Sequence, residues 1–211
     1  MAKIFAKDTF AVVDLETTGT QREKGHHIIQ FGCAIIKNMK VVKTYSFMIN
    51  PHRAIPQSVV NLTGIHNEYV QGKDDFSVYA PKIIEILKGT VFVAHNVDFD
   101  LPFLNYELVQ HGYEALTNKA IDTVELAKIA FPTLPSYKLS DLTAQLKIRH
   151  LNPHKADSDA YGTAVLLIKI IHKLESLPQA TLNTLSSLSS SLIRDTSWLI
   201  TTIVDNLRKQ K

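Results

Sequence analysis

The apolar and polar positions of the first fifty residues form patterns that are typical of β-strands. Residues 10–13, Phe-Ala-Val-Val, form a continuous apolar run, which is typical of a central strand buried on both faces of a sheet. Two β-rich runs follow at 27–37 and 40–50, and only Asn38 and Met39 separate them, a connection short enough for an antiparallel hairpin. The pattern therefore predicts three strands that form an antiparallel meander.

Further along the chain, the spacing of apolar residues changes to that of helices alternating with strands. The predicted helices cover 56–62, 76–88, 99–111, 124–131, 140–147 and 155–174, and the strands between them cover 90–96 and 120–123. A meander followed by βαβα units predicts an α/β fold. Its sheet is mixed and five-stranded, an antiparallel meander plus parallel strands, with helices on both faces.

The composition changes after about Pro178, where serine and threonine become frequent. We predict a domain at 1–175 and a helical extension at 176–211. One interpretation of the extension is a final amphipathic helix docked on the domain. The other is a connector to a further region, because many large apolar residues lie close to the terminus and would need something to cover them. These residues are Trp198, Leu199, Ile200, Ile203 and Leu207.

The overall composition indicates the class of protein but does not identify a binding partner. The 211 residues are 45% hydrophobic and carry a formal net charge of +3, which permits nucleic-acid binding but does not argue for it. The single cysteine, Cys33, lies in an apolar run, so it indicates a reducing compartment. Neither a signal peptide nor a membrane span is apparent. We therefore expect a soluble, cytoplasmic protein without a membrane partner.

Asp14 and Glu16 interrupt the first apolar run two positions apart. Side chains at i and i+2 of a strand emerge on the same face, so the two carboxylates are expected side by side. Ionised carboxylates are costly in such a strand unless they are paired or bind a metal ion. The alternative is that both acids lie at an exposed strand end and cap the turn at 17–19.

Two other segments carry acids at positions where functional groups gather in α/β sheets. The turn after the strand at 90–96 holds Asp98 and Asp100. We interpret Asp98 as a helix cap and Asp100 as the better ligand candidate. The third segment is PHKADSDA, where His154 and Asp159 are about 140° apart on an ideal helix, so both face one site only if His154 precedes the helix. Helical periodicity does not show which of the two acids, Asp157 or Asp159, points at the site.

Four segments in this order resemble the motifs of the DEDDh, or DnaQ-like, exonuclease superfamily: VVDLETTG, VAHNVDFDLPFL, AIDTVELAK and PHKADSDA. The resemblance runs from about residue 10 to about residue 174 and implies an RNase H-like fold and 3'-5' exonuclease activity. It places the metal-binding acids on Asp14, Glu16, Asp100 and Asp159, and the general base on His154. Carboxylate ligands without cysteine suit two divalent ions, Mg²⁺ or Mn²⁺.

The same resemblance suggests residues that contact the substrate. Thr17, Thr18 and Gly19 are expected to offer donors to the terminal nucleotide, Asn96 to lie near the phosphate, and Leu62 to pack against the last base. Asp122 is left outside the site.

A closer likeness concerns the stretches at 50–70, 120–142 and 177–193, which resemble the exonuclease domain at the front of the longer DinG-type proteins of Gram-positive bacteria. In those proteins a helicase-like region follows. This likeness favours single-stranded or frayed 3' ends of DNA as substrate and nucleoside 5'-monophosphates as products. The alternatives are a 3'-5' exoribonuclease and a non-catalytic nucleic-acid-binding module.

Overall fold

A five-stranded mixed sheet forms the centre of the molecule. The computed structural model describes residues 4–150 and 152–209, so the outermost residues of the two predicted domain ranges lie outside it. The strand order is β3-β2-β1-β4-β5, and β1 is central, as its continuous apolar run predicted. The strands are β1 (Thr9–Thr17), β2 (Ile28–Lys37), β3 (Lys40–Met48), β4 (Val91–Ala94) and β5 (Ala120–Asp122).

The pairing confirms the predicted meander and the parallel strands beside it. β1 is antiparallel to β2, which is antiparallel to β3, while β4 runs parallel to both β1 and β5. Asn38 and Met39 have φ values of 51° and 57°. A two-residue hairpin turn needs this left-handed backbone to match the twist of its strands.

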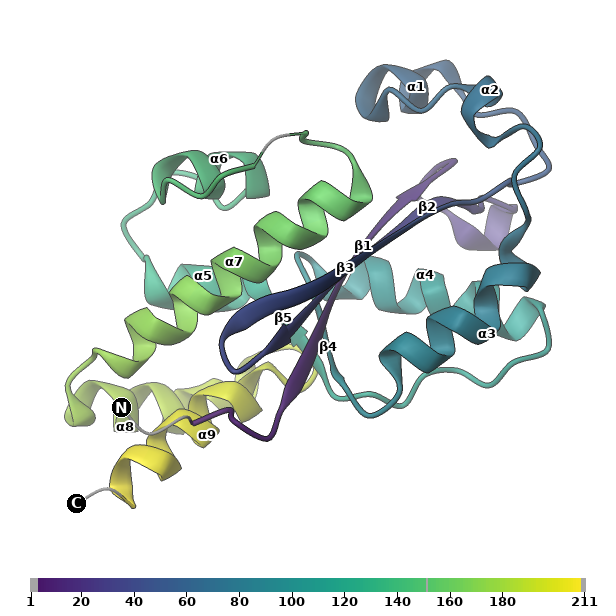
Figure 1. The fold of residues 1–211 in the computed structure, drawn as a ribbon. Helices are drawn as coiled ribbons and strands as arrows, with labels where there is room; N and C mark the ends of the chain where they lie inside the picture. Colours follow the sequence, from purple (N-terminus) through teal and green to yellow (C-terminus); the bar gives the residue numbers. More distant parts are fainter. Residues whose placement is uncertain (1–3, 151, 210–211) are drawn as a thin grey trace.

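Helices cover both faces of the sheet (Figure 1). They are α1 (Gln57–Thr63), α2 (Asn67–Val70), α3 (Phe76–Leu87), α4 (Val97–Gln110), α5 (Thr123–Ala130), α6 (Leu139–Gln145), α7 (Ala156–Glu175), α8 (Gln179–Leu188) and α9 (Thr196–Arg208), with 3-10 turns η1 (Arg22–Lys24) and η2 (Ser189–Ser191). The alternation along β1 sorts its side chains between two cores. Phe10 and Val12 join the core under α7, whereas Ala11 and Val13 join the core under α3 and α4.

The extension after residue 175 forms two helices, where we expected one. Leu182 of α8 and Leu199, Ile200 and Ile203 of α9 are fully buried in the core that α7 also covers. The chain between the helices pairs with the edge of β5, because the Asp195 N–H donates to the Ala120 carbonyl at 2.9 Å. Both helices therefore pack on the core that α7 covers, whereas the division at residue 175 and the connector interpretation stay predictions.

Within the described ranges, no helix combines the length and apolar character needed to cross a membrane.

Candidate metal centre

Three carboxylates from two separate elements meet at one end of β1. Asp14 and Glu16 emerge on the face of β1 that α7 covers, and Asp159 lies in the first turn of α7. Each offers one oxygen atom, and these three atoms all lie within 4.8 Å of one another. The structure thus brings together the acids of the first and fourth motifs, VVDLETTG and PHKADSDA.

A glycine in the neighbouring strand allows α7 to begin so close to β1. Gly32 of β2 pairs with Asp14 in the register of the sheet. A Cβ at Gly32 would lie 2.1 Å from the carbonyl oxygen of Ala156, the first residue of α7. Only a residue without a side chain permits this contact, which places Asp159 above the end of β1. Asp157 points elsewhere, and its carboxylate accepts a hydrogen bond from Gln30 at 3.3 Å.

Asp100 joins the site from α4 on the opposite face. Its side chain is buried, and Oδ1 accepts the backbone N–H of Leu15, the residue between Asp14 and Glu16, at 3.0 Å. Asp98 does not act as the expected helix cap, because its carboxylate pairs with Arg194 at 2.6 Å. The cap comes from Asp122, whose Oδ2 accepts the N–H of Val97 at 2.7 Å. This long-range bond also starts α4 at residue 97, two residues earlier than the sequence pattern predicted.

Asp14, Glu16 and Asp100 resist ionisation, because their pKa values are raised. Burial raises the pKa of Asp14 well above its ordinary value, and the neighbouring Asp100, Asp159 and Glu16 raise it further. Burial and Asp159 raise the pKa of Glu16 to about 7, against the opposing effect of Lys155. The pKa of Asp100 is also raised, chiefly by burial. Clustered hard oxygen donors that repel one another fit a divalent cation, which offsets the repulsion.

Metal-free protein should lose stability as the pH rises through the range in which Glu16 ionises. The pKa of Glu16 is about 7 in the folded chain, against an ordinary value of 4.5. Between these values the folded state retains a proton that the unfolded state has released, so folding is favoured most below this window. Stability should fall by roughly 3 kcal/mol across it, at about 1.4 kcal/mol for each tenfold change in proton affinity. Chemical denaturation in EDTA at several pH values measures this change.

The matched control for this experiment is Glu16→Gln, which keeps the shape of the side chain without a titrating group. Its stability should depend less on pH than that of the wild type, and added Mg²⁺ should stabilise the wild type most at the upper end of the window. Equal pH dependence in the two proteins would show that Glu16 titrates normally.

His154 lies on the turn before α7, as the helical phase required. Its side chain is exposed, and its backbone adopts φ 63°. Its N–H donates to Oδ2 of Asp159 at 3.1 Å. The backbone of this turn is therefore fixed to the acid cluster, while the imidazole faces solvent beside it.

A second histidine contacts the cluster and was missed by sequence reasoning. Nε2 of His150 lies 2.5 Å from Oδ1 of Asp159, and its side chain is only 6% exposed. Its Nδ1 lies 3.3 Å from the Thr143 hydroxyl on α6, and a Cβ at Gly162 would lie 3.3 Å from the ring. The only signal in the sequence is a histidine four residues before His154, because the contact depends on how α6 packs against α7.

The residues expected to contact substrate surround the same end of the sheet. Thr17 and Thr18 are buried where β1 ends, and Leu62 is 59% exposed on α1. The Thr17 hydroxyl donates to the Gly19 carbonyl at 2.8 Å. Asn96 is exposed before α4 in the left-handed region, at φ 84°.

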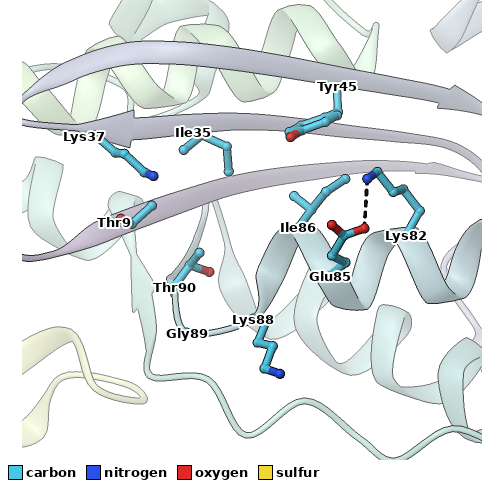
Figure 2. A pocket seen from close by; sticks show the side chains of 10 residues that line it. All are labelled: Thr9, Ile35, Lys37, Tyr45, Lys82, Glu85, Ile86, Lys88, Gly89 and Thr90. Carbon is cyan, nitrogen blue, oxygen red and sulfur yellow. Dashed lines mark hydrogen bonds and ion pairs between the residues drawn. The ribbon is translucent and has the colours of Figure 1, made fainter.

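A pocket of about 290 Å³ lies at the opposite end of the sheet and is distinct from the acid cluster. Figure 2 shows it between the first residue of β1, Thr9, and the segment that leads into β4. Lys82 and Glu85 of α3 form a 2.8 Å ion pair at its wall. None of the four acids lines this pocket, so the pocket is not the candidate metal centre.

Comparisons with known proteins agree with this arrangement. Residues 11–167 match the family model described as Exonuclease, RNase T. The chain is similar to the 3'-5' exonuclease DinG of Bacillus subtilis (strain 168), with 40% identity over 202 residues that cover 96% of this chain and 22% of that protein. It thus spans about a fifth of the length of this curated relative.

Two solved structures share the fold. Exonuclease X in complex with 5' overhanging duplex DNA has a TM-score of 0.60 at 25% identity, covering 77% of this chain and 91% of that one. The nuclease domain of 3'hExo, a DEDDh family member bound to rAMP, has a TM-score of 0.68 at 20% identity, covering 78% and 92%. These likenesses confirm the predicted RNase H-like arrangement of sheet and helices.

Proposed function

Because this chain belongs to the exonuclease family, as its four motifs predicted, we propose that it is a 3'-5' exonuclease acting on single-stranded or frayed DNA. The observation that carries the proposal is the meeting of Asp14, Glu16 and Asp159 within 4.8 Å, with Asp100 held against the same strand. Acids this close to one another, with Asp14 and Glu16 half-buried and Asp159 buried, are expected where a protein binds divalent ions.

Four carboxylates would hold the metal ions that the family uses, and we propose two ions, Mg²⁺ or Mn²⁺. The ligands are Asp14, Glu16, Asp100 and Asp159. When bound, such ions stabilise the negative charge that develops during phosphodiester hydrolysis. The Leu15 N–H fixes Asp100, while the His154 N–H and the His150 ring fix both oxygens of Asp159. Two of the four proposed ligands, Asp100 and Asp159, are thus oriented by other groups of the protein, as metal ligands usually are.

His154 is proposed to accept the proton of the attacking water. It stands on a turn whose backbone N–H is bonded to Asp159, and its exposed ring would approach a water held over the acids by rotation of the side chain. Water adds to the phosphorus, the bond to the 3' oxygen of the preceding nucleotide breaks, and this oxygen takes up a proton from solvent. The products are a shortened strand with a 3' hydroxyl and a nucleoside 5'-monophosphate.

The terminal nucleotide is proposed to lie between the end of β1 and α1. Thr17, Thr18 and Gly19 would face its sugar, the exposed Leu62 would pack against the last base, and Asn96 would lie near the phosphate. An apolar side chain that is 59% exposed is suited to base stacking.

DNA is proposed as the substrate on the strength of the DinG likeness, and RNA is the second candidate. One structural neighbour was solved with DNA and the other with rAMP, so both nucleic acids are to be tested. We further propose that the domain acts in the cytoplasm and, in a longer protein, precedes a helicase-like region. This chain covers 22% of its longer DinG relative, which supports the proposal of a further region but does not bear on location.

Digestion of 5'-labelled single-stranded DNA and matched RNA tests the proposal. With Mg²⁺ or Mn²⁺ we expect a ladder that shortens from the 3' end of the DNA, and no ladder with EDTA. Faster shortening of the RNA would establish the exoribonuclease instead. Binding of both strands without cleavage under any metal would refute the enzymatic function and favour a binding module.

A further inference from the structure

Glu107 on α4 is a buried carboxylate that lies outside the acid cluster. Its residue is only 2% exposed, and it lies seven positions after Asp100 on the same helix. A buried carboxylate without a role in metal binding needs hydrogen-bond donors, and their identity shows what it holds in place.

One oxygen of Glu107 binds the beginning of β2. Oε1 accepts the backbone N–H of Ile28 at 3.2 Å and the Nδ1–H of His27 at 3.0 Å. The other oxygen lies 3.8 Å from Nδ1 of His111, which is bonded to the carbonyl of Glu107 itself at 2.8 Å. The carboxylate thus ties α4 to Ile28, the first residue of β2, and to His27, the residue before it.

These two residues face the end of β1. Thr17 pairs with Ile28 across an irregularity in the β1–β2 ladder, which shifts register between Glu16 and Thr17. The Thr18 N–H donates to the His27 carbonyl at 2.8 Å, and the His27 N–H donates to the Thr18 hydroxyl at 2.9 Å. Where a ladder is irregular, backbone pairing is less regular, and side-chain hydrogen bonds add to what holds the chain in position.

We propose that Glu107 is a positioning residue for nucleotide binding, which acts through His27 and Ile28 on Thr17 and Thr18. Asp100 and Glu107 then have separate tasks on α4: Asp100 serves the acid cluster, and Glu107 fixes the neighbouring turn. The inference rests on the proposed function, because it concerns how tightly the 3' nucleotide binds. It assigns Glu107 no contact with substrate or metal.

Glu107→Leu tests the inference in the full chain. The substitution removes the acceptor of the buried Ile28 N–H, so KM for single-stranded DNA should rise about 10-fold or more, with kcat within about threefold. The affinity for dAMP, measured by NMR titration, should fall in parallel, while calorimetric Mn²⁺ binding stays unchanged. Glu107→Gln keeps an acceptor oxygen at the same place and should restore both affinities.

The matched control is His111→Ala, which alters the other side of Glu107 and should leave KM within about twofold. His27→Ala keeps the test decisive if Glu107→Leu does not fold, because the 40% exposed His27 side chain can be removed with little loss of core. It should raise KM in the same direction. Loss of kcat or of Mn²⁺ binding with KM unchanged would overturn the inference. Absence of nuclease activity in the wild type would instead refute the proposed function, and dAMP affinity would still test Glu107.

Discussion

Replacing Asp159 by asparagine is expected to lower the exonuclease rate by at least about 10³-fold. A metal ion stabilises the transition state by several kcal/mol, and each loss of about 1.4 kcal/mol lowers the rate tenfold. The amide keeps the size of the side chain and an oxygen for the His154 N–H, so the fold should persist. What disappears is one of the three carboxylates whose ligand oxygens lie within 4.8 Å of one another. Calorimetric titration with Mn²⁺ should show weaker binding, and circular dichroism should show an unchanged fold.

The chain supplies a matched control two residues away. Asp157 is in the same first turn of α7, but its carboxylate contacts Gln30 and lies outside the three-acid group. Asp157→Asn should therefore keep the rate within about threefold and bind Mn²⁺ like the wild type. If the two variants lost activity equally, the geometry of the acid cluster would not explain catalysis.

Local patterns in the sequence are sufficient to predict the strands and the hairpin, but not the order of all five strands in the sheet. The apolar run at 10–13 and the two-residue connection at 38–39 specify a central strand and a hairpin, because burial on both faces and tight turns leave signatures in adjacent residues. The same i, i+2 rule places Asp14 and Glu16 on one face. The pairing of β1 with β2 and β4 confirms these predictions.

Local sequence patterns could not predict contacts between segments that are far apart in the chain. Asp122 caps α4 from 25 residues away, so the start of α4 and the role of Asp98 were misjudged. The choice between Asp157 and Asp159 depends on α7 resting on Gly32, a feature of backbone packing rather than of periodicity. His150 reaches Asp159 only because α6 and α7 pack together.

The C-terminal extension shows a second kind of limit. Its apolar residues were evident in the sequence, but their partner was not, because apolar content alone does not say what covers it. In the structure Trp198 packs against Phe5, with ring centroids 5.8 Å apart, and Asp195 pairs with the edge of β5. An unpaired strand edge exposes donors and acceptors, and the extension covers them.

His154→Ala is expected to lower kcat by about 10²–10⁴-fold, the usual contribution of a general base. KM and Mn²⁺ binding should change little, because the exposed imidazole holds neither Asp159 nor the substrate in place. Asp159 is held by the backbone N–H of His154, which remains after the substitution. Single-turnover digestion of 5'-labelled DNA at saturating Mg²⁺ isolates this step from binding and release.

The neighbouring His150 makes this experiment discriminating, since both histidines approach Asp159. His150 is enclosed, with both ring nitrogens engaged by Asp159 and Thr143, so it has no free nitrogen for a water proton. Its removal should therefore weaken Mn²⁺ binding along with the rate, whereas removal of His154 should spare the metal. If His154→Ala kept the wild-type rate while His150→Ala lost it with metal binding intact, the base would be His150, and the Asp159 contact would have to break during each turnover.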